Sequence, residues 1–298
     1  MSKENLHKHK EISNLRLVFF LNLLFALAEI IGGMWTNSVA ILADALHDLG
    51  DSITLGLSWQ LERIAQRKGD LRYSYGYQRY SLLGAVVSAI VLVVGSVFMV
   101  LATVPRLIHP EPSDARGMLL FALTGILVNG IAVLRLREGK TMHARVITWH
   151  LLEDVLGWLA VLIVSLFLLS ADIQILDPIL SLLITAYVLF NVFRNLKKTL
   201  ALFLQAVPDE VEIKHIEQEL LQTPKVKGIH HTHIWSLDGQ HHVLTTHIVL
   251  NENAKKEDIR NIKSVIRDLT QRCGLEHTTV EFEYLEGDCS MSKKGRDM

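Results

Sequence analysis

The chain has 298 residues, of which half are hydrophobic, and its formal net charge is −1. This charge balance excludes the strongly basic character of a nucleic-acid-binding protein, and no nucleic acid partner is expected. The hydrophobic fraction is typical of a membrane protein that carries a soluble domain. The only two cysteines, Cys273 and Cys289, lie near the C-terminus, which excludes a disulfide framework and favours a reducing, cytosolic setting for that end.

Six apolar runs in the first two thirds of the chain are long enough to cross a bilayer. They cover residues 16–35, 38–60, 80–104, 117–135, 146–170 and 173–193. The polar residues before them lack the pattern of a cleavable signal peptide. We therefore expect a cytosolic N-terminal arm at residues 1–15 and an all-α, six-helix transmembrane domain at residues 16–206.

Lysine and arginine are distributed unequally between the two sides of these predicted helices. Sixteen of them lie before the first run, in the loops after the second and fourth runs, and just after the sixth. The loops on the opposite side contain only Arg106 and Arg116. The positive-inside rule therefore predicts that both termini are cytosolic, in a multi-pass protein of the plasma membrane, in this case a bacterial inner membrane.

The chain becomes charged and soluble in character after residue 206. Helical periodicity over residues 207–222 is followed by two strand-like segments, 226–237 and 241–251, joined by a turn at Asp238 and Gly239. A second helix over residues 255–273 ends at Gly274, and a third strand follows at 277–285. This α-β-β-α-β order predicts a small cytosolic α+β domain at residues 207–286, with its helices on one face of a sheet. Residues 287–298 are expected to form a disordered tail.

Two predicted membrane helices carry the same motif, a histidine followed four residues later by an aspartate. His47 and Asp51 lie in the second helix, and His150 and Asp154 lie in the fifth. Residues four apart share one face of a helix. Two imidazoles and two carboxylates form the ligand set of a tetrahedral zinc site, although Cd²⁺, Co²⁺ and Ni²⁺ accept similar donors.

Ionisable side chains inside a bilayer need a compensating partner. A central aspartate costs roughly 2.5–3.5 kcal/mol on insertion scales, so the two motifs imply pairing, protonation or a bound ion. Single polar residues in these helices also serve helix packing or line a lumen, and both interpretations stay open for five of them: Asn22, Glu29, Asp44, Asn129 and Glu153. Counted at ~1.5 Å per residue from helix ends near Ser38 and Ser170, the two motifs differ in depth by about 10 Å, so a shared site needs tilt or an earlier end of the fifth helix.

The charges of this ligand set suggest a mechanism. Two ionised aspartates and two neutral histidines bind a divalent cation with no net charge, which a medium of low dielectric constant tolerates. The empty site would instead take up protons, because burial and a like-charged neighbour both favour the neutral carboxyl, and histidine titrates near neutrality. A site that alternates between the two sides of the membrane would therefore exchange a metal ion for protons.

Several segments resemble the cation diffusion facilitator family, which exports zinc and related metals. They are "FALAEIIGGMWTNSVAILADALHDLGDS", "YSYGYQRYSLLGAVVSAIVL", "HLLEDVLGW", "DPILSLLI" and "GIHHTHIWSLDG", spread over nearly the whole chain. The resemblance implies a homodimer with a metallochaperone-like (ferredoxin-like) cytosolic domain and proton-driven antiport. It places His47, Asp51, His150 and Asp154 at the transport site.

The resemblance also implies metal ligands in the cytosolic domain, namely His230, His233, His247 and Glu283. An exposed polar sheet face that binds no metal is an equally acceptable interpretation of these residues. Cys289 could join such a site, but a free thiol in a loose tail is the favoured interpretation. Tyr77 stands where many members have a histidine, and because Asp70 alone is a poor metal site, the accessory loop site is expected to be absent or weak.

Two other functional classes are less consistent with the sequence. An intramembrane metalloenzyme would need a vacant coordination position and a general base, for which Glu153 is the available residue. The chain lacks an HExxH motif, and its four-ligand set leaves no vacancy, so no enzymatic activity is predicted. A metal sensor anchored by its helices would not need buried charges in two of them.

Overall fold

The structure is a computed structural model that describes residues 3–136, 142–171, 173–284 and 289. Side chains are not described for residues 3–18, 135–136 and 142–150, nor at positions 21, 58, 59, 62 and 132. The chain divides into two compact units. The first contains the chain up to Arg63 together with Leu83–Leu196, and the second contains Ile64–Leu82 and the chain from Lys197 onward.

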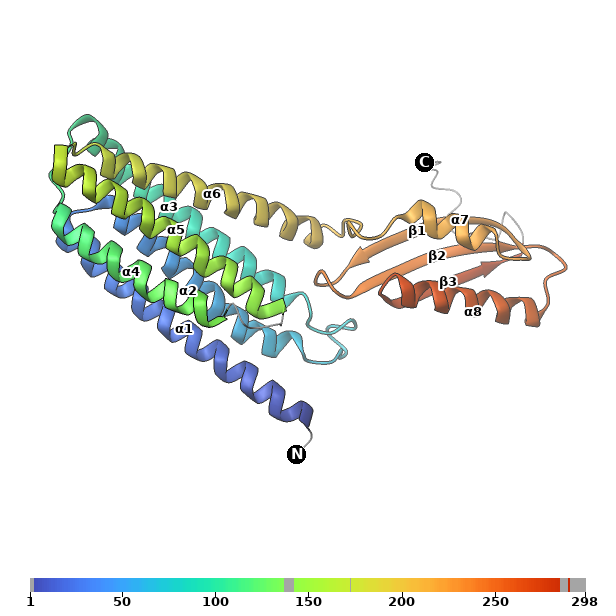
Figure 1. The fold of residues 1–298 in the computed structure, drawn as a ribbon. Helices are drawn as coiled ribbons and strands as arrows, with labels where there is room; N and C mark the ends of the chain where they lie inside the picture. Colours follow the sequence, from blue (N-terminus) through green and yellow to red (C-terminus); the bar gives the residue numbers. More distant parts are fainter. Residues whose placement is uncertain (1–2, 137–141, 172, 285–288, 290–298) are drawn as a thin grey trace. The chain divides into compact units, whose positions relative to one another are not determined.

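Six long helices, α1 to α6, account for the predicted apolar runs, and they lie side by side (Figure 1). Their bounds are α1 Lys3–Thr36, α2 Val39–Ala65, α3 Tyr80–Ile108, α4 Ala115–Leu136, α5 Met142–Ala171 and α6 Leu176–Phe203. By length and composition, α3, α6 and the Leu151–Ala171 part of α5 suffice to cross a membrane, and α1 and α4 contain shorter apolar stretches. The first helix begins at Lys3, so the segment predicted as an arm continues α1, in keeping with its lack of glycine and proline.

Apolar contacts bring four of these helices together around Trp158. This α5 side chain is 1% exposed and belongs to a buried cluster with Ile41 of α2, Met118 of α4 and Leu180 of α6. A separate cluster joins α3 to α6 through Ala89, Val188 and Val192. The indole of Trp158 lies against Gly125 of α4, where an added Cβ would come within 2.3 Å of the ring.

We expect the substitution Gly125→Ala to destabilise the helical unit by about 1–3 kcal/mol, because a methyl group would overlap the Trp158 ring and push α4 from α5. Thermal unfolding of the purified protein in detergent measures the effect. Gly130→Ala is the matched control, because an added Cβ there meets nothing within 4 Å and improves helix propensity. Equal stability of the two variants would contradict this packing.

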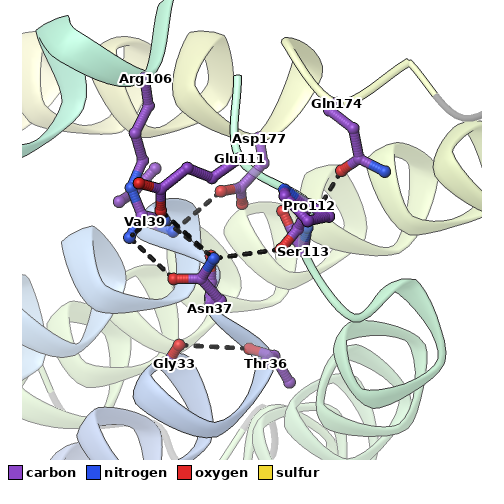
Figure 2. A network of polar contacts seen from close by, with 10 residues as sticks. All are labelled: Gly33, Thr36, Asn37, Val39, Arg106, Glu111, Pro112, Ser113, Gln174 and Asp177. Atoms are coloured by element: carbon purple, nitrogen blue, oxygen red, sulfur yellow. Dashed lines mark hydrogen bonds and ion pairs between the residues drawn. The ribbon is translucent and has the colours of Figure 1, made fainter. Parts of the chain in front are cut away.

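A polar network holds the turn between α1 and α2 (Figure 2). Asp177 of α6, 1% exposed, accepts hydrogen bonds from the Ser38 hydroxyl and from the first backbone N–H groups of α2. Arg106 of α3 donates to both the backbone carbonyl and the side-chain oxygen of Asn37, each at 2.8 Å. Asn37 adopts a left-handed conformation with φ 52°, which asparagine tolerates better than most residues. These contacts fix where α2 begins, and so set the height of the residues that follow along it.

The second unit contains the predicted α-β-β-α-β order: α7 Ile213–Leu221, β1 Val226–Ser236, β2 His242–Leu250, α8 Lys256–Arg272 and β3 Leu275–Glu283. Strand β2 lies in the centre of the sheet, antiparallel to β1 and parallel to β3. Both helices share one apolar core with the sheet and touch each other, which places them on the same face, as predicted. Gly239 and Gly274, at φ 97° and 65°, form the hairpin turn and the end of α8.

The start of α7 differs from the sequence prediction, which had the helical pattern begin at residue 207. The N–H of Val211 bonds to the carbonyl of Pro208, closing a turn, and the helix begins only at Ile213 behind an extended Glu212. Val211 is buried in the domain core together with Ile216 and Leu220 of α7. Packing of this turn against the core therefore takes precedence over the local helical periodicity.

Candidate metal centres

The first half of the predicted transmembrane site lies on α2. His47 and Asp51 are one helical turn apart, and the His47 Nε2 and Asp51 Oδ2 atoms are 3.8 Å apart. Their side chains are 21% and 25% exposed, whereas Asp44 and Asp48 of the same helix are almost fully buried. An imidazole and a carboxylate at this separation can bind one cation between them after a small rotamer adjustment.

The second half lies on α5, where Asp154 is 8% exposed. An added Cβ on Gly157 of α5 would lie 3.5 Å from the Asp44 carboxylate oxygen, so α2 and α5 are in contact at this level. The two helices run in opposite directions with the same rise per residue. Asp44 interacts electrostatically with both His47 and Asp154, so the two halves of the predicted site lie in the same region of the helical unit.

The remaining predicted ligand on α5 is His150, whose side chain lies outside the described residues. Counting from helix ends gives the two motifs a difference of about 10 Å in depth. This difference arises because α5 extends further beyond the contact level than α2 does: α2 starts at Val39, close before Asp44, whereas α5 continues to Ala171 beyond Gly157.

Two further carboxyls surround this site, and the sequence reasoning did not assign them to it. Asp48 of α2 is 3% exposed, and Glu29 of α1 is 1% exposed. Both interact electrostatically with Asp44 and with Asp154. The sequence does contain a signal that could have assigned Asp48 to the site. Asp44, Asp48 and Asp51 are spaced by four and three residues, which places them on one helix face.

A second group of metal-ligating side chains lies in the sheet domain. His230, His247, Glu283 and Cys289 each present one ligand atom, and these atoms all lie within 4.8 Å of one another. His247 Nδ1 is 2.7 Å from Glu283 Oε1, and Cys289 Sγ is 3.8 Å from the same nitrogen. Two imidazoles, a carboxylate and a thiolate are a suitable set for a four-coordinate Zn²⁺ site.

Strand register explains which histidines join this group. His230 of β1 pairs with His247 of β2, but the register then shifts, so that the next paired residue, His233, lies opposite Thr245. His231 adopts φ 50° at this bulge, and His233 is exposed. His233 therefore lies outside the ligand group, and Cys289 occupies the place predicted for it.

The environment of Glu283 suits a metal ligand. Burial raises the pKa of this carboxyl, but hydrogen bonds from His247 and His230 outweigh that effect, so the pKa of Glu283 lies below its ordinary value. The group is therefore ionised at neutral pH. Val280 and Phe282, the alternate residues of β3, pack on the core, and this alternation directs Glu283 to the other face of the sheet.

Cys289 is a free thiol, as expected, but it is buried and does not lie in a loose tail. Its side chain is 5% exposed and lies against His247, although it forms no disulfide. Short polar segments after a last strand are usually interpreted as disordered. The nearby imidazole and carboxylate supply the contacts that this interpretation lacked.

The loop between α2 and α3 binds its aspartate internally. Asp70 accepts hydrogen bonds from the backbone N–H groups of Arg72 and Tyr73, at 2.8 and 2.7 Å, and from the hydroxyl of Tyr77, also at 2.7 Å. These bonds, that from Tyr73 first, hold the pKa of Asp70 below its ordinary value. Because Tyr77 occupies its second oxygen, Asp70 has little capacity left for a metal ion.

Comparison with protein families decides between a transporter and the other classes. The model for the cation efflux transmembrane domain matches residues 15–204, and the model for the cation efflux protein cytoplasmic domain matches residues 208–284. The chain belongs to the cation efflux, or cation diffusion facilitator, family. It is therefore a membrane transporter for divalent metal efflux and not an enzyme.

Curated relatives in this family cover almost the full length of the chain. It is 31% identical to the zinc transporter ZitB of Pectobacterium atrosepticum, over 98% of the chain and 93% of that protein. It is 29% identical to the metal cation efflux system protein CzcD of Cupriavidus metallidurans, over 91% of the chain and 86% of the relative. A protein of Bacillus subtilis named a cadmium, cobalt and zinc/H(+)-K(+) antiporter is 25% identical over 93% of the chain and 91% of its own length.

Proposed function

We propose that this cation efflux protein exports Zn²⁺ from the cytosol in exchange for protons, through one tetrahedral site formed by His47, Asp51, His150 and Asp154. The observation that carries the proposal is the contact between Asp44 of α2 and Gly157 of α5, which supports a meeting of the two helices that contain the motifs. The close approach of His47 and Asp51 supports it further. Cd²⁺, Co²⁺ and Ni²⁺ are secondary substrates, since the same donors accept them.

Charge neutrality provides the coupling. With zinc bound, two carboxylates and two neutral imidazoles balance the ion, and the same side chains take up protons when zinc leaves. Exchange of zinc for protons then keeps the buried site close to neutral both when zinc is bound and when protons are bound. The names of the relatives from Pectobacterium atrosepticum and Bacillus subtilis, which state zinc transport and zinc/H(+) antiport, agree with this choice of substrate and coupling ion.

The proposed topology has six membrane-spanning helices within residues 16–206, with residues 1–15 and both termini in the cytosol of a bacterial inner membrane. The lysine and arginine distribution supports this orientation. Residues 207–286 form the cytosolic metal-binding and dimerisation domain, and residues 287–298 the tail, of which the structure describes only Cys289. We propose a homodimer, in keeping with the match to the family's cytoplasmic domain.

Proteoliposomes that contain an internal pH dye test the antiport. A pH gradient with an acidic interior should drive zinc into the vesicles, and zinc added without a gradient should move protons in the opposite direction. Empty liposomes with the same gradient control for leakage. Zinc entry without counter-movement of protons would contradict proton exchange, and entry that does not respond to the gradient would contradict it as well.

We also propose that the cytosolic cluster of His230, His247, Glu283 and Cys289 binds one zinc ion. Cys289→Ser is expected to weaken metal binding there by about 10–100-fold, with a larger loss for Cd²⁺ than for Zn²⁺, because cadmium depends more on a soft thiolate. Titration of the purified protein with each metal measures the change. Cys273→Ser, which removes the other thiol, is the matched control. Equal affinities in the two variants would remove Cys289 from the ligand set.

A further inference from the structure

Glu29 is a buried carboxyl of α1 for which the described part of the helical unit provides no hydrogen-bond donor. Its side chain is 1% exposed, and neither carboxylate oxygen receives a hydrogen bond from any described residue. Burying an ionised carboxylate in this way is unfavourable, since no donor among the described residues replaces the lost hydration. Glutamine or leucine would be less costly to bury at this position of α1. A glutamate here therefore points to a functional role.

Among the described side chains, the ionisable groups that act on Glu29 are all acidic. Asp44 and Asp48 approach it from α2, and Asp154 does so from α5. On the side of α4, the neighbouring contact is apolar, with Phe121 against Gly32 one turn along α1. Among the described residues, no lysine or arginine interacts with Glu29. Its charge is therefore not balanced by a basic side chain.

The contact between Glu29 and Asp48 suggests that a proton, and not a basic side chain, neutralises Glu29. The two carboxyl groups lie within hydrogen-bonding reach of each other. Two ionised carboxylates cannot form such a bond, because neither has a hydrogen to donate. When Glu29 carries a proton it becomes the donor to Asp48, which also accounts for the lack of any donor directed at its own oxygens.

We propose that Glu29 is a dedicated proton-binding residue of the antiport, separate from the metal ligands; this rests on the proposed function. When the metal site is empty, Glu29 holds a proton that it gives to Asp48 as a hydrogen bond. When a divalent cation binds next to Asp154, its positive charge favours ionised Glu29, and the proton leaves toward the cytosol. After the metal is released on the far side, Glu29 takes a proton from there.

Two flows measured in proteoliposomes separate proton coupling from metal binding. Uptake of zinc driven by a pH gradient needs proton transfer, whereas exchange of labelled for unlabelled zinc at equal pH needs only the metal site. Glu29→Gln should lower the driven uptake by about tenfold or more while exchange stays within about twofold of wild type. Glu29→Asp should restore part of the driven uptake. The purified Glu29→Gln protein should also release about one proton fewer per subunit when zinc is added.

Glu153→Gln provides the matched control, because it makes the same change in α5 at a half-buried position that is neither a metal ligand nor the proposed proton carrier. Both flows should be unchanged there. Parallel loss of uptake and exchange in a folded Glu29→Gln protein would make Glu29 a metal ligand or a structural group and overturn the proposal. Two unchanged flows would overturn it too.

Asp51→Ala, assayed beside these variants, distinguishes failure of the metal site from failure of the proton carrier. Loss of both flows in Asp51→Ala with selective loss of driven uptake in Glu29→Gln supports the metal site and the proton carrier together. Retention of both flows in Asp51→Ala contradicts the metal site. In that case the difference between the two flows in Glu29→Gln still decides whether Glu29 carries protons.

Discussion

Asp51→Ala is expected to lower zinc transport by at least about 100-fold, which exceeds the loss usual for residues that only support a metal ligand. The substitution removes one of the four donors and one of the two charges that balance the dication. The remaining three donors leave the ion with a net positive charge in a medium of low dielectric constant. Zinc uptake into everted membrane vesicles, corrected for the amount of protein, measures the effect.

Asp209→Ala is the control for this experiment, since Asp209 is exposed and lies outside both metal groups. We expect it to transport zinc at the wild-type rate. Asp154→Ala should behave like Asp51→Ala, because the proposed site needs both carboxylates to balance the charge of the metal ion. Normal transport in either variant would show that the two motifs do not form the transport site.

His47→Asp is expected to lower the preference for zinc over Mn²⁺ by about tenfold. Imidazole nitrogen suits zinc, whereas manganese is a harder ion that accepts carboxylate oxygen equally well. The variant site would contain three carboxylates and one imidazole, so total transport should survive while the selectivity changes. Uptake of each metal in competition with the other gives the ratio directly.

His109→Asp is the matched control for selectivity, because His109 lies exposed just after α3. Its zinc-to-manganese ratio should equal that of wild type. An unchanged ratio in His47→Asp would show that His47 does not determine selectivity. A variant that transports neither metal would show that the imidazole is required for metal binding itself.

The periodic elements of the sequence predict most of the fold. Apolar runs locate all six long helices, and alternation along β3 correctly separates Val280 and Phe282 from Glu283. Local signals fail where packing competes with them. The turn at Pro208 packs into the core through Val211, so α7 starts late, and α1 begins at Lys3 because helix propensity continues beyond the apolar run.

The candidate sites depend on contacts that spacing alone does not reveal. The i, i+4 rule pairs His47 with Asp51, but the relative height of α2 and α5 follows from where α2 begins, and that is fixed by Asp177 and Arg106. The bulge at His231 moves His233 out of the ligand group, and a sequence of strand-forming residues gives no sign of it. Glu29 and Cys289 gain their significance only from the side chains that surround them.

X-ray absorption at the zinc edge tests the central claim most directly, in protein that carries His247→Ala and Cys289→Ser so that the cytosolic cluster does not contribute. Zinc bound to the remaining site should show about four nitrogen or oxygen donors near ~2.0 Å, with the outer-shell scattering of two imidazoles and no sulfur. A shell that contains sulfur, or six oxygens without imidazole scattering, would contradict the proposed site of His47, Asp51, His150 and Asp154.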